Sequence, residues 1–153
     1  MKKPLTIVLA ILTLTFFISC GKHTENKHEH SSTEKTVEHK EIMESLVSLD
    51  NGKLWSANTE TTQGINNMKN LMKEFSDKES VSEYATLKNN LEKEFSTILT
   101  ECTMKGESHN QLHNYLVPMK EMFEGLTSSD LGTCKENYNI LNDHLKEYSK
   151  YFK

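Results

Sequence analysis

Apolar residues recur every three or four positions over the C-terminal two thirds of the chain, which is the spacing of one face of an α-helix. Four such stripes predict helices over residues 59–75, 80–106, 108–126 and 129–152. No window shows the apolar and polar alternation of a β-strand. Because the helices are amphipathic and their connections are short, we expect an all-α, up-down-up-down four-helix bundle over residues 49–153.

Local signals mark the ends of these helices. Ser80 with Glu83, and Ser108 with Gln111, have the spacing of a capping box, in which two side chains bond the first backbone N–H groups of a helix. Pro118 lies inside the third predicted helix, where it removes a backbone donor. The sequence therefore predicts two capped helix starts and one kinked helix.

The start of the chain has the features of a secretion signal. Two lysines precede an apolar run over residues 5–18, which is too short to cross a bilayer core of ~30 Å. The run ends in Phe17-Ile18-Ser19-Cys20-Gly21. This ending resembles the lipobox of bacterial lipoproteins, in which a small residue precedes a cysteine that is lipidated before cleavage, although Phe17 stands where Leu is most common.

The lipobox resemblance implies a lipid anchor and a location in the cell. Residues 1–19 would be a lipoprotein signal peptide, and Cys20 would become the acylated first residue, with palmitate among its acyl chains. Several chains on one residue anchor a protein stably, whereas a single chain is marginal. We therefore expect a protein that is lipid-anchored in the bacterial cell envelope and faces the periplasm. Because Gly21 rather than Asp follows the cysteine, we expect the outer membrane.

Residues 20–48 form a polar stretch that lacks the apolar residues needed for a core, so we interpret it as a flexible tether. It contains His23, His28 and His30, which are possible auxiliary ligands for zinc or copper. The alternative, a solvated linker without metal, is favoured because disordered ligands lose conformational entropy when they bind.

Charge and motifs exclude several classes of function. The chain carries a net charge of −4, and its 18 basic residues are all lysine. Nucleic-acid partners are not expected, because such proteins normally present a positive surface rich in arginine. The chain has no H-E-x-x-H, G-x-S-x-G or phosphate-binding glycine motif, and a small bundle offers little room for a substrate. We therefore expect a protein that is not an enzyme.

The segment around residues 102–113 has the densest chemistry. His109 and His113 are four residues apart and share one face of a helix. In an antiparallel pair, residues equally far from the turn face each other, which places Cys102 beside His109 and His144 near His113. Cysteine, histidine and an auxiliary Met104 are soft ligands, which favour copper(I), with zinc next. The alternative is that these residues are ordinary cap, surface and core residues.

The same antiparallel geometry, in which residues equally far from a turn face each other, also applies to Cys134 and to Trp55. It places Cys134 level with Met122, which is roughly 20 Å along the helix from His109, whereas a disulfide needs Cα atoms within ~7 Å. We therefore expect Cys102 and Cys134 not to be paired. Trp55, which precedes the first helix, is expected at the end that carries Cys102, as a possible lid.

The segments K-L-W, E-C-T-M-K-G-E and H-N-Q-L-H of the predicted bundle are similar to segments of small uncharacterised lipoproteins of Bacteroidota-like bacteria, a resemblance that implies no established activity. The sequence thus predicts a membrane-anchored extracytoplasmic binding protein that binds copper or zinc at one end of a bundle. The alternative is a non-catalytic envelope lipoprotein that binds a protein partner, or has a structural role, without metal.

Overall fold

The computed structural model describes residues 46–153, so the signal segment, Cys20 and the tether histidines lie outside the described residues. The described chain is all-α. Its helices are α2 (Thr59–Glu74), α3 (Val81–Glu101), α4 (Gly106–Leu116), α5 (Met119–Gly125) and α6 (Leu131–Tyr151). The predicted four-helix bundle is confirmed, with α4 and α5 together forming its third arm. Among the described helices, none has the length and apolar character needed to cross a bilayer.

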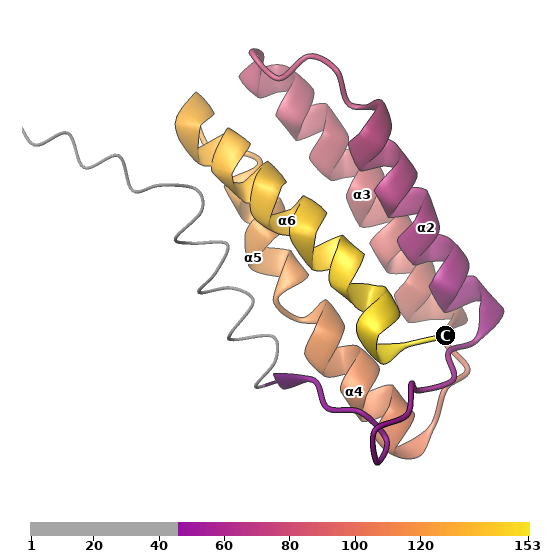
Figure 1. The fold of residues 1–153 in the computed structure, drawn as a ribbon. Coiled ribbons are helices and arrows are strands. Elements are labelled where there is room, and N and C mark those ends of the chain that lie inside the picture. Colours follow the sequence, from indigo (N-terminus) through magenta and orange to yellow (C-terminus); the bar gives the residue numbers. More distant parts are fainter. Residues whose placement is uncertain (1–45) are drawn as a thin grey trace, which may run out of the picture.

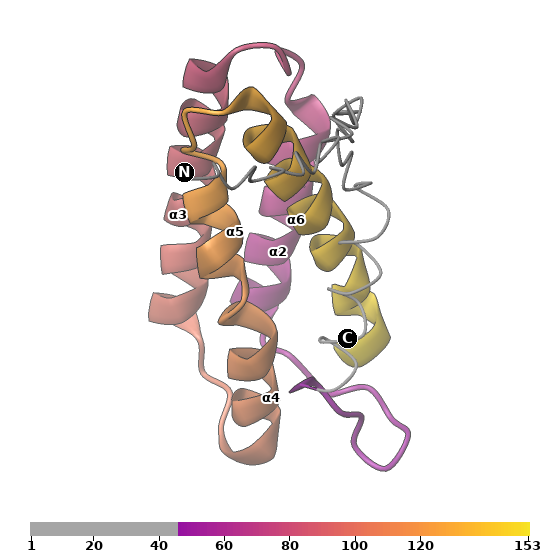
Figure 2. The ribbon, with the colours of Figure 1, turned by 90° about the vertical axis from the view of Figure 1, so that its left-hand side faces the viewer.

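The four arms alternate in direction. α2 packs against α3, and α6 returns alongside α2 and α5 (Figure 1). Figure 2 shows α4 and α5 end to end, with α4 extending beyond the ends of α2 and α3. We call this end, which includes residues 46–58, 102–113 and 151–153, the lower end. The upper end includes the turns at residues 75–80 and 126–130.

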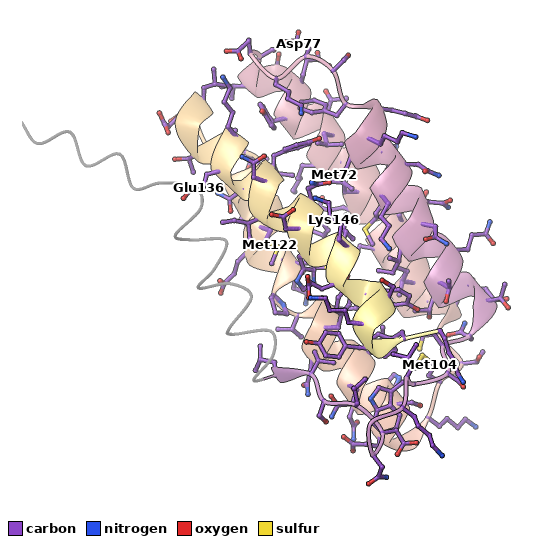
Figure 3. All side chains as sticks on the ribbon, in the orientation of Figure 1. Met72, Asp77, Met104, Met122, Glu136 and Lys146 are labelled. Carbon is purple, nitrogen blue, oxygen red and sulfur yellow. The ribbon has the colours of Figure 1, made fainter. Side chains whose placement is uncertain are left out.

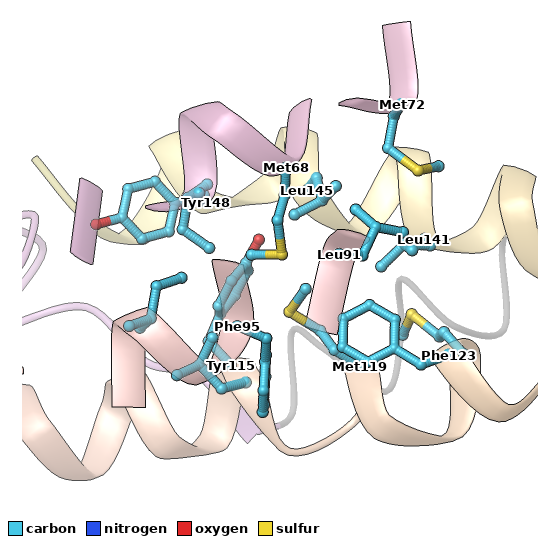
Figure 4. Packing of buried hydrophobic residues seen from close by; sticks show 14 of the residues in the cluster. Met68, Met72, Leu91, Phe95, Tyr115, Met119, Phe123, Leu141, Leu145 and Tyr148 are labelled. Atoms are coloured by element: carbon cyan, nitrogen blue, oxygen red, sulfur yellow. The ribbon is translucent and has the colours of Figure 1, made fainter. Parts of the chain in front are cut away.

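The core consists of the predicted apolar stripes, whose members come from every arm (Figure 4). Its largest fully buried side chains are Tyr84, Tyr115, Phe123, Ile65, Met68, Met72, Leu91, Ile98, Leu112, Leu116 and Met119. Gly64 lets α2 approach α3 closely, because a Cβ at this position would lie 2.4 Å from Cγ1 of Ile98. Burial of these stripes is the main source of stability in such a bundle.

The helix starts differ from the predicted capping boxes. Ser80 precedes α3, but its hydroxyl lies 2.9 Å from the hydroxyl of Ser82 and makes no cap bond. Ser108 lies inside α4, which begins two residues earlier at Gly106, and its hydroxyl donates to the carbonyl of Lys105. The prediction at Ser108 is therefore wrong, whereas Ser80 is the N-cap residue of α3 as predicted but does not make the capping-box bond. Asp130, in contrast, caps α6, because its carboxylate accepts the backbone N–H of Thr133 at 2.7 Å.

Pro118 divides the third arm. α4 ends at Leu116 and α5 begins at Met119, with turn residues between them. Proline has no backbone N–H to donate to the carbonyl of Asn114, four residues earlier. The predicted kink is therefore present as a short interruption, in which Val117 and Pro118 keep helical backbone angles between α4 and α5.

A segment that we call the strap, residues 46–57, crosses the lower end (Figure 1). Its tip is a two-residue turn closed by reciprocal backbone bonds of 2.9 Å between Asp50 and Lys53. Asn51 and Gly52 both have positive φ, as a type I′ turn requires. Val47, at the start of the strap, is buried in the core. The packed domain thus includes residues 46–48, which the sequence pattern assigned to the tether.

Candidate metal centre

A short connection brings the candidate ligands together at the lower end. α3 ends at Glu101, and Cys102 continues in an extended conformation. Gly106 has a φ of +63°, a conformation that glycine adopts easily, and it begins α4. The chain therefore reverses direction within four residues and places the first turn of α4 beside Cys102.

Cys102, His109 and His113 form a continuous chain of side-chain contacts, which we call the Cys-His-His row. The Sγ atom of Cys102 lies 3.6 Å from Nδ1 of His109. The Nε2 atom of His109 lies 3.0 Å from Nε2 of His113, and the two rings meet edge to face with centroids 4.5 Å apart. The predicted contact between Cys102 and His109 and the predicted shared face of the two histidines are confirmed.

The Cys-His-His row is open to solvent on one side. Cys102 and His109 are half-buried, and His113 is exposed. Cys102 also packs against the edge of the hydrophobic core. An ion would therefore meet a thiol held by the core and imidazoles reachable from solvent.

Met104 lies in the same connection and is half-buried against the core. Figure 3 shows its sulfur at the lower end, near the C-terminal residues. The thioether is a soft donor close in sequence to Cys102. Its auxiliary role as a ligand stays a prediction.

His144 does not join the Cys-His-His row. Its ring is buried and lies stacked on Tyr115, with centroids 4.4 Å apart. Nε2 of His144 donates to the carbonyl of Tyr115 at 2.9 Å, and the hydroxyl of Tyr115 donates back to the carbonyl of His144 at 3.0 Å. The expected convergence of His144 with the other three residues is therefore not found. The reason is that α4 stops just beyond Tyr115, and the imidazole bonds a carbonyl of that last turn.

Burial has a further effect on Tyr115. Because its side chain is fully enclosed, desolvation raises the pKa of the phenol well above its ordinary value. The hydroxyl therefore remains a donor at all ordinary pH values. This keeps the reciprocal pair with His144 intact, and the pair holds α4 against α6.

The donor atoms do not surround a single point. Within residues 46–153, no group of three or more cysteine, histidine, aspartate or glutamate side chains is placed to hold one metal ion. The geometry of His109 explains this result, because Nδ1 faces Cys102 and Nε2 faces His113. The row offers pairs of donors rather than a closed cage.

The strap fixes the position of α4, and the sequence pattern did not reveal it. The backbone N–H of Ser48 donates to Oε1 of Gln111 at 2.8 Å, and Nδ2 of Asn114 donates to the carbonyl of Leu46 at 2.9 Å. Gln111 and Asn114 flank His113 in the sequence. The sequence places several apolar residues in this segment, Val47 among them, but no periodic pattern that shows which helix they contact.

Trp55 lies at the lower end, as predicted. Its indole Nε1 donates to the carbonyl of Ser48 at 2.6 Å, and its backbone pairs with Tyr151 and Lys153. These bonds hold the half-buried ring against the core rather than free in solvent. The role of Trp55 as a lid stays a prediction.

Cys134 occupies the upper end and is fully buried. Its thiol donates to the carbonyl of Ser128 at 3.3 Å and to that of Leu126 at 3.5 Å. Burial raises the pKa of this thiol, because the thiolate would lose its hydration. In the described part of the chain, Cys102 and Cys134 are both unpaired, which confirms the prediction that they do not form a disulfide.

Comparison with known proteins adds no further constraint. No protein-family model matches the sequence, and no curated protein or solved structure matches it significantly.

Proposed function

We propose that the protein is a membrane-anchored, extracytoplasmic binding protein that binds a soft transition metal, copper or zinc, at the Cys-His-His row. One observation carries the proposal, the contact of 3.6 Å between Sγ of Cys102 and Nδ1 of His109. Thiolate and imidazole are the ligands that copper(I) and zinc share. His113 extends the row on the same face of α4.

The distance itself suits an ion. Zinc bonds of about 2.3 Å to sulfur and about 2.0 to 2.1 Å to nitrogen, at a tetrahedral angle, place the two donor atoms about 3.6 Å apart. The observed separation of 3.6 Å matches this value and supports the proposal that the pair binds an ion. Preorganised ligands reduce the entropy that binding costs.

The anchor belongs to the same proposal. The lipobox resemblance at Cys20 supports acylation and attachment to the envelope membrane, and Gly21 supports the outer membrane. The polar stretch that follows separates the anchor from the bundle. Mass spectrometry of the protein from its native membrane tests this part, because acylation adds the mass of fatty acids to Cys20.

The test of metal binding needs a chain without competing ligands. We define the reference chain as the full sequence with Cys20→Ser and with the N-terminal histidines replaced by glutamine, namely His23, His28, His30 and His39. Solubilised in detergent, it is titrated with copper(I) under anaerobic, reducing conditions, and with zinc separately. We expect one equivalent of copper(I) to bind and to raise the melting temperature, because an ion that binds the native state alone stabilises it.

A triple variant provides the comparison. Replacing Cys102, His109 and His113 by alanine in the reference chain should abolish both binding and thermal stabilisation. Cys134→Ser is the matched control, because it removes a thiol from the other end of the bundle. Equal binding by the triple variant and the reference chain would refute the proposal.

A second candidate function is the binding of an envelope protein without metal. It is favoured by exposed apolar residues, among them Leu99, which is 46% exposed and lines a groove between α3 and α5. Phe95 and Phe123 line this groove together with charged residues. A photo-crosslinker at Leu99 tests it in intact cells, where absence of any crosslinked protein would count against this function.

A further inference from the structure

The two ring nitrogens of His109 serve different partners. Nδ1 lies 3.6 Å from the sulfur of Cys102, and Nε2 lies 3.0 Å from Nε2 of His113. The two nitrogens of an imidazole point in different directions. One ion therefore cannot bind between His109 and Cys102 and, at the same time, between His109 and His113.

Both separations are hydrogen-bond distances in the absence of an ion, and only the separation between Cys102 and His109 also fits two ligands of one ion. A sulfur and a nitrogen bound to one tetrahedral ion lie about 3.6 Å apart, which is the distance observed between Cys102 and His109. Two nitrogens bound to one such ion lie about 3.3 to 3.4 Å apart. The observed 3.0 Å between the histidines is shorter and is typical of a hydrogen bond.

We infer that Cys102 and Nδ1 of His109 bind the ion, whereas His113 is a positioning residue that accepts a hydrogen bond from Nε2–H of His109. The inference rests on the proposed function and divides its three residues into two ligands and one support. A histidine ligand commonly donates its second ring N–H to a neighbouring acceptor, which fixes its tautomer and orientation. His113 supplies that acceptor from the next turn of α4.

This division bears on the identity of the metal. Structural zinc sites take four protein ligands, a number that the described residues do not bring together. A thiolate and one imidazole form a soft donor pair with open positions, which suits copper(I). We therefore expect the reference chain to prefer copper(I) over zinc when both are offered.

The first test uses metal-free protein and does not depend on the proposed function. Nitrogen-15 NMR of the histidine rings, at a pH of about 8 where ordinary imidazoles are neutral, reports which ring nitrogen carries the proton. We expect His109 to carry it on Nε2 and His113 to carry it on Nδ1. A proton on Nδ1 of His109 would overturn the inference.

The second test uses variants of the reference chain loaded with copper(I). His109→Gln should abolish binding, whereas His113→Ala should weaken it by about 10- to 100-fold, the usual effect of losing a supporting hydrogen bond. His113→Gln should bind nearly as well as the reference chain, because the glutamine oxygen is an alternative acceptor. Failure of this rescue, with binding as weak as in His113→Ala, would count against the supporting role.

X-ray absorption separates the two roles directly. We expect the same sulfur and nitrogen neighbours of copper in the reference chain and in His113→Ala. Loss of a nitrogen neighbour in His113→Ala would overturn the inference and leave the proposed function standing. A reference chain that binds no copper(I) would refute both.

Discussion

The two ends of the bundle each contain a cysteine, but they surround it in opposite ways. At the upper end, Cys134 is fully buried and its thiol bonds two backbone carbonyls. At the lower end, Cys102 is half-buried and faces an imidazole nitrogen. The first arrangement satisfies a thiol as a small core residue, whereas the second places the thiol beside a second candidate donor atom. The same residue type thus has a packing role at one end and a candidate chemical role at the other.

The elements around the cysteines differ as well. The upper end is closed by aromatic packing, in which Phe75 lies between Tyr84 at 4.8 Å and Tyr138 at 5.6 Å. The lower end has α4 projecting beyond the neighbouring helices, and the strap holds it through side-chain hydrogen bonds (Figure 2). Aromatic rings pack at the lower end too, around Tyr115. The ends therefore differ in the projecting helix and the strap rather than in aromatic packing, and the projecting end carries the candidate site.

The largest difference between the ends is expected in copper binding. In the reference chain, Cys102→Ser should lower copper(I) affinity by more than about 100-fold, beyond the usual effect of losing a supporting residue, because it removes a ligand. Cys134→Ser should leave the affinity unchanged. Competition with a copper(I) chelator measures both. Equal losses in the two variants would show that the two thiols do not differ in this role.

The rates at which the two thiols react with an external reagent should also differ strongly. In the metal-free reference chain, an aromatic disulfide reagent should modify Cys102 at least about 100-fold faster than Cys134, because a buried thiol reacts only when the structure opens. Absorbance of the released thiol measures the two rates, and the single variants Cys102→Ser and Cys134→Ser assign them. In urea the rates should become similar. Fast reaction of Cys134 in the native protein would contradict the burial that distinguishes the ends.

Buried tyrosines allow a matched comparison of stability. Tyr115→Phe removes a hydroxyl that donates to His144 at the lower half, and Tyr138→Phe removes one that donates to Met72 at 2.7 Å near the upper end. Each loss should reduce the free energy of unfolding by about 1 kcal/mol, as is usual for one buried hydrogen bond. Urea denaturation measures the change.

Hydrogen exchange of the backbone amides shows which end of the bundle each of these two variants affects. Tyr115→Phe should increase exchange in α4, whereas Tyr138→Phe should leave α4 protected, because Tyr138 bonds α2 rather than the third arm. An equal increase in both variants would indicate that the two ends open together.

The smallest expected effect is on acid stability. The backbone N–H and the hydroxyl of Thr133 lower the pKa of Asp130 at the upper end, and the amides of Gln111 and Asn110 lower that of Glu107 at the lower end. A carboxyl whose folded pKa is lowered stabilises the fold above its unfolded pKa of about 4, and this contribution disappears as pH falls through the folded pKa. Asp130→Asn and Glu107→Gln keep an acceptor but remove the titration.

Each of these variants should therefore lose less stability than the parent chain between neutral pH and pH about 3. Thermal unfolding across this range measures the difference, and the double variant should show the sum of the two effects, because the sites lie at opposite ends. A steeper acid loss in either variant would contradict the direction of the pKa change.

Much of the fold was predictable, because a helical stripe of apolar residues has one way to be buried in a bundle. The contact between Cys102 and His109 was predictable for the same reason, since antiparallel pairing fixes which residues meet across a turn. The position of His144 was not. The prediction placed it by register alone, whereas the end of α4 left a buried carbonyl that the imidazole bonds.

Other features of the structure could not be predicted from the spacing of apolar residues. The capping box at Ser108 failed because α4 begins two residues earlier, at Gly106, so that Ser108 lies within the first turn of the helix. The strap was missed because its hold on α4 depends on backbone groups and on the amides of Gln111 and Asn114, which carry no apolar pattern. Antiparallel register therefore predicts which candidate ligands meet, but not the segment that fixes their helix.

The backbone pairing of Trp55 with Tyr151 and Lys153 has a consequence for the order of folding. It joins segments from opposite ends of the described chain, so it closes the longest loop in the domain, and long-range contacts form late because they lose the most chain entropy. The helical pairs around Cys134 involve nearer neighbours in sequence and should form first. We expect this pairing to form last, whereas the Cys-His-His row, whose contacts join residues four and seven positions apart, can form before the two ends of the domain meet.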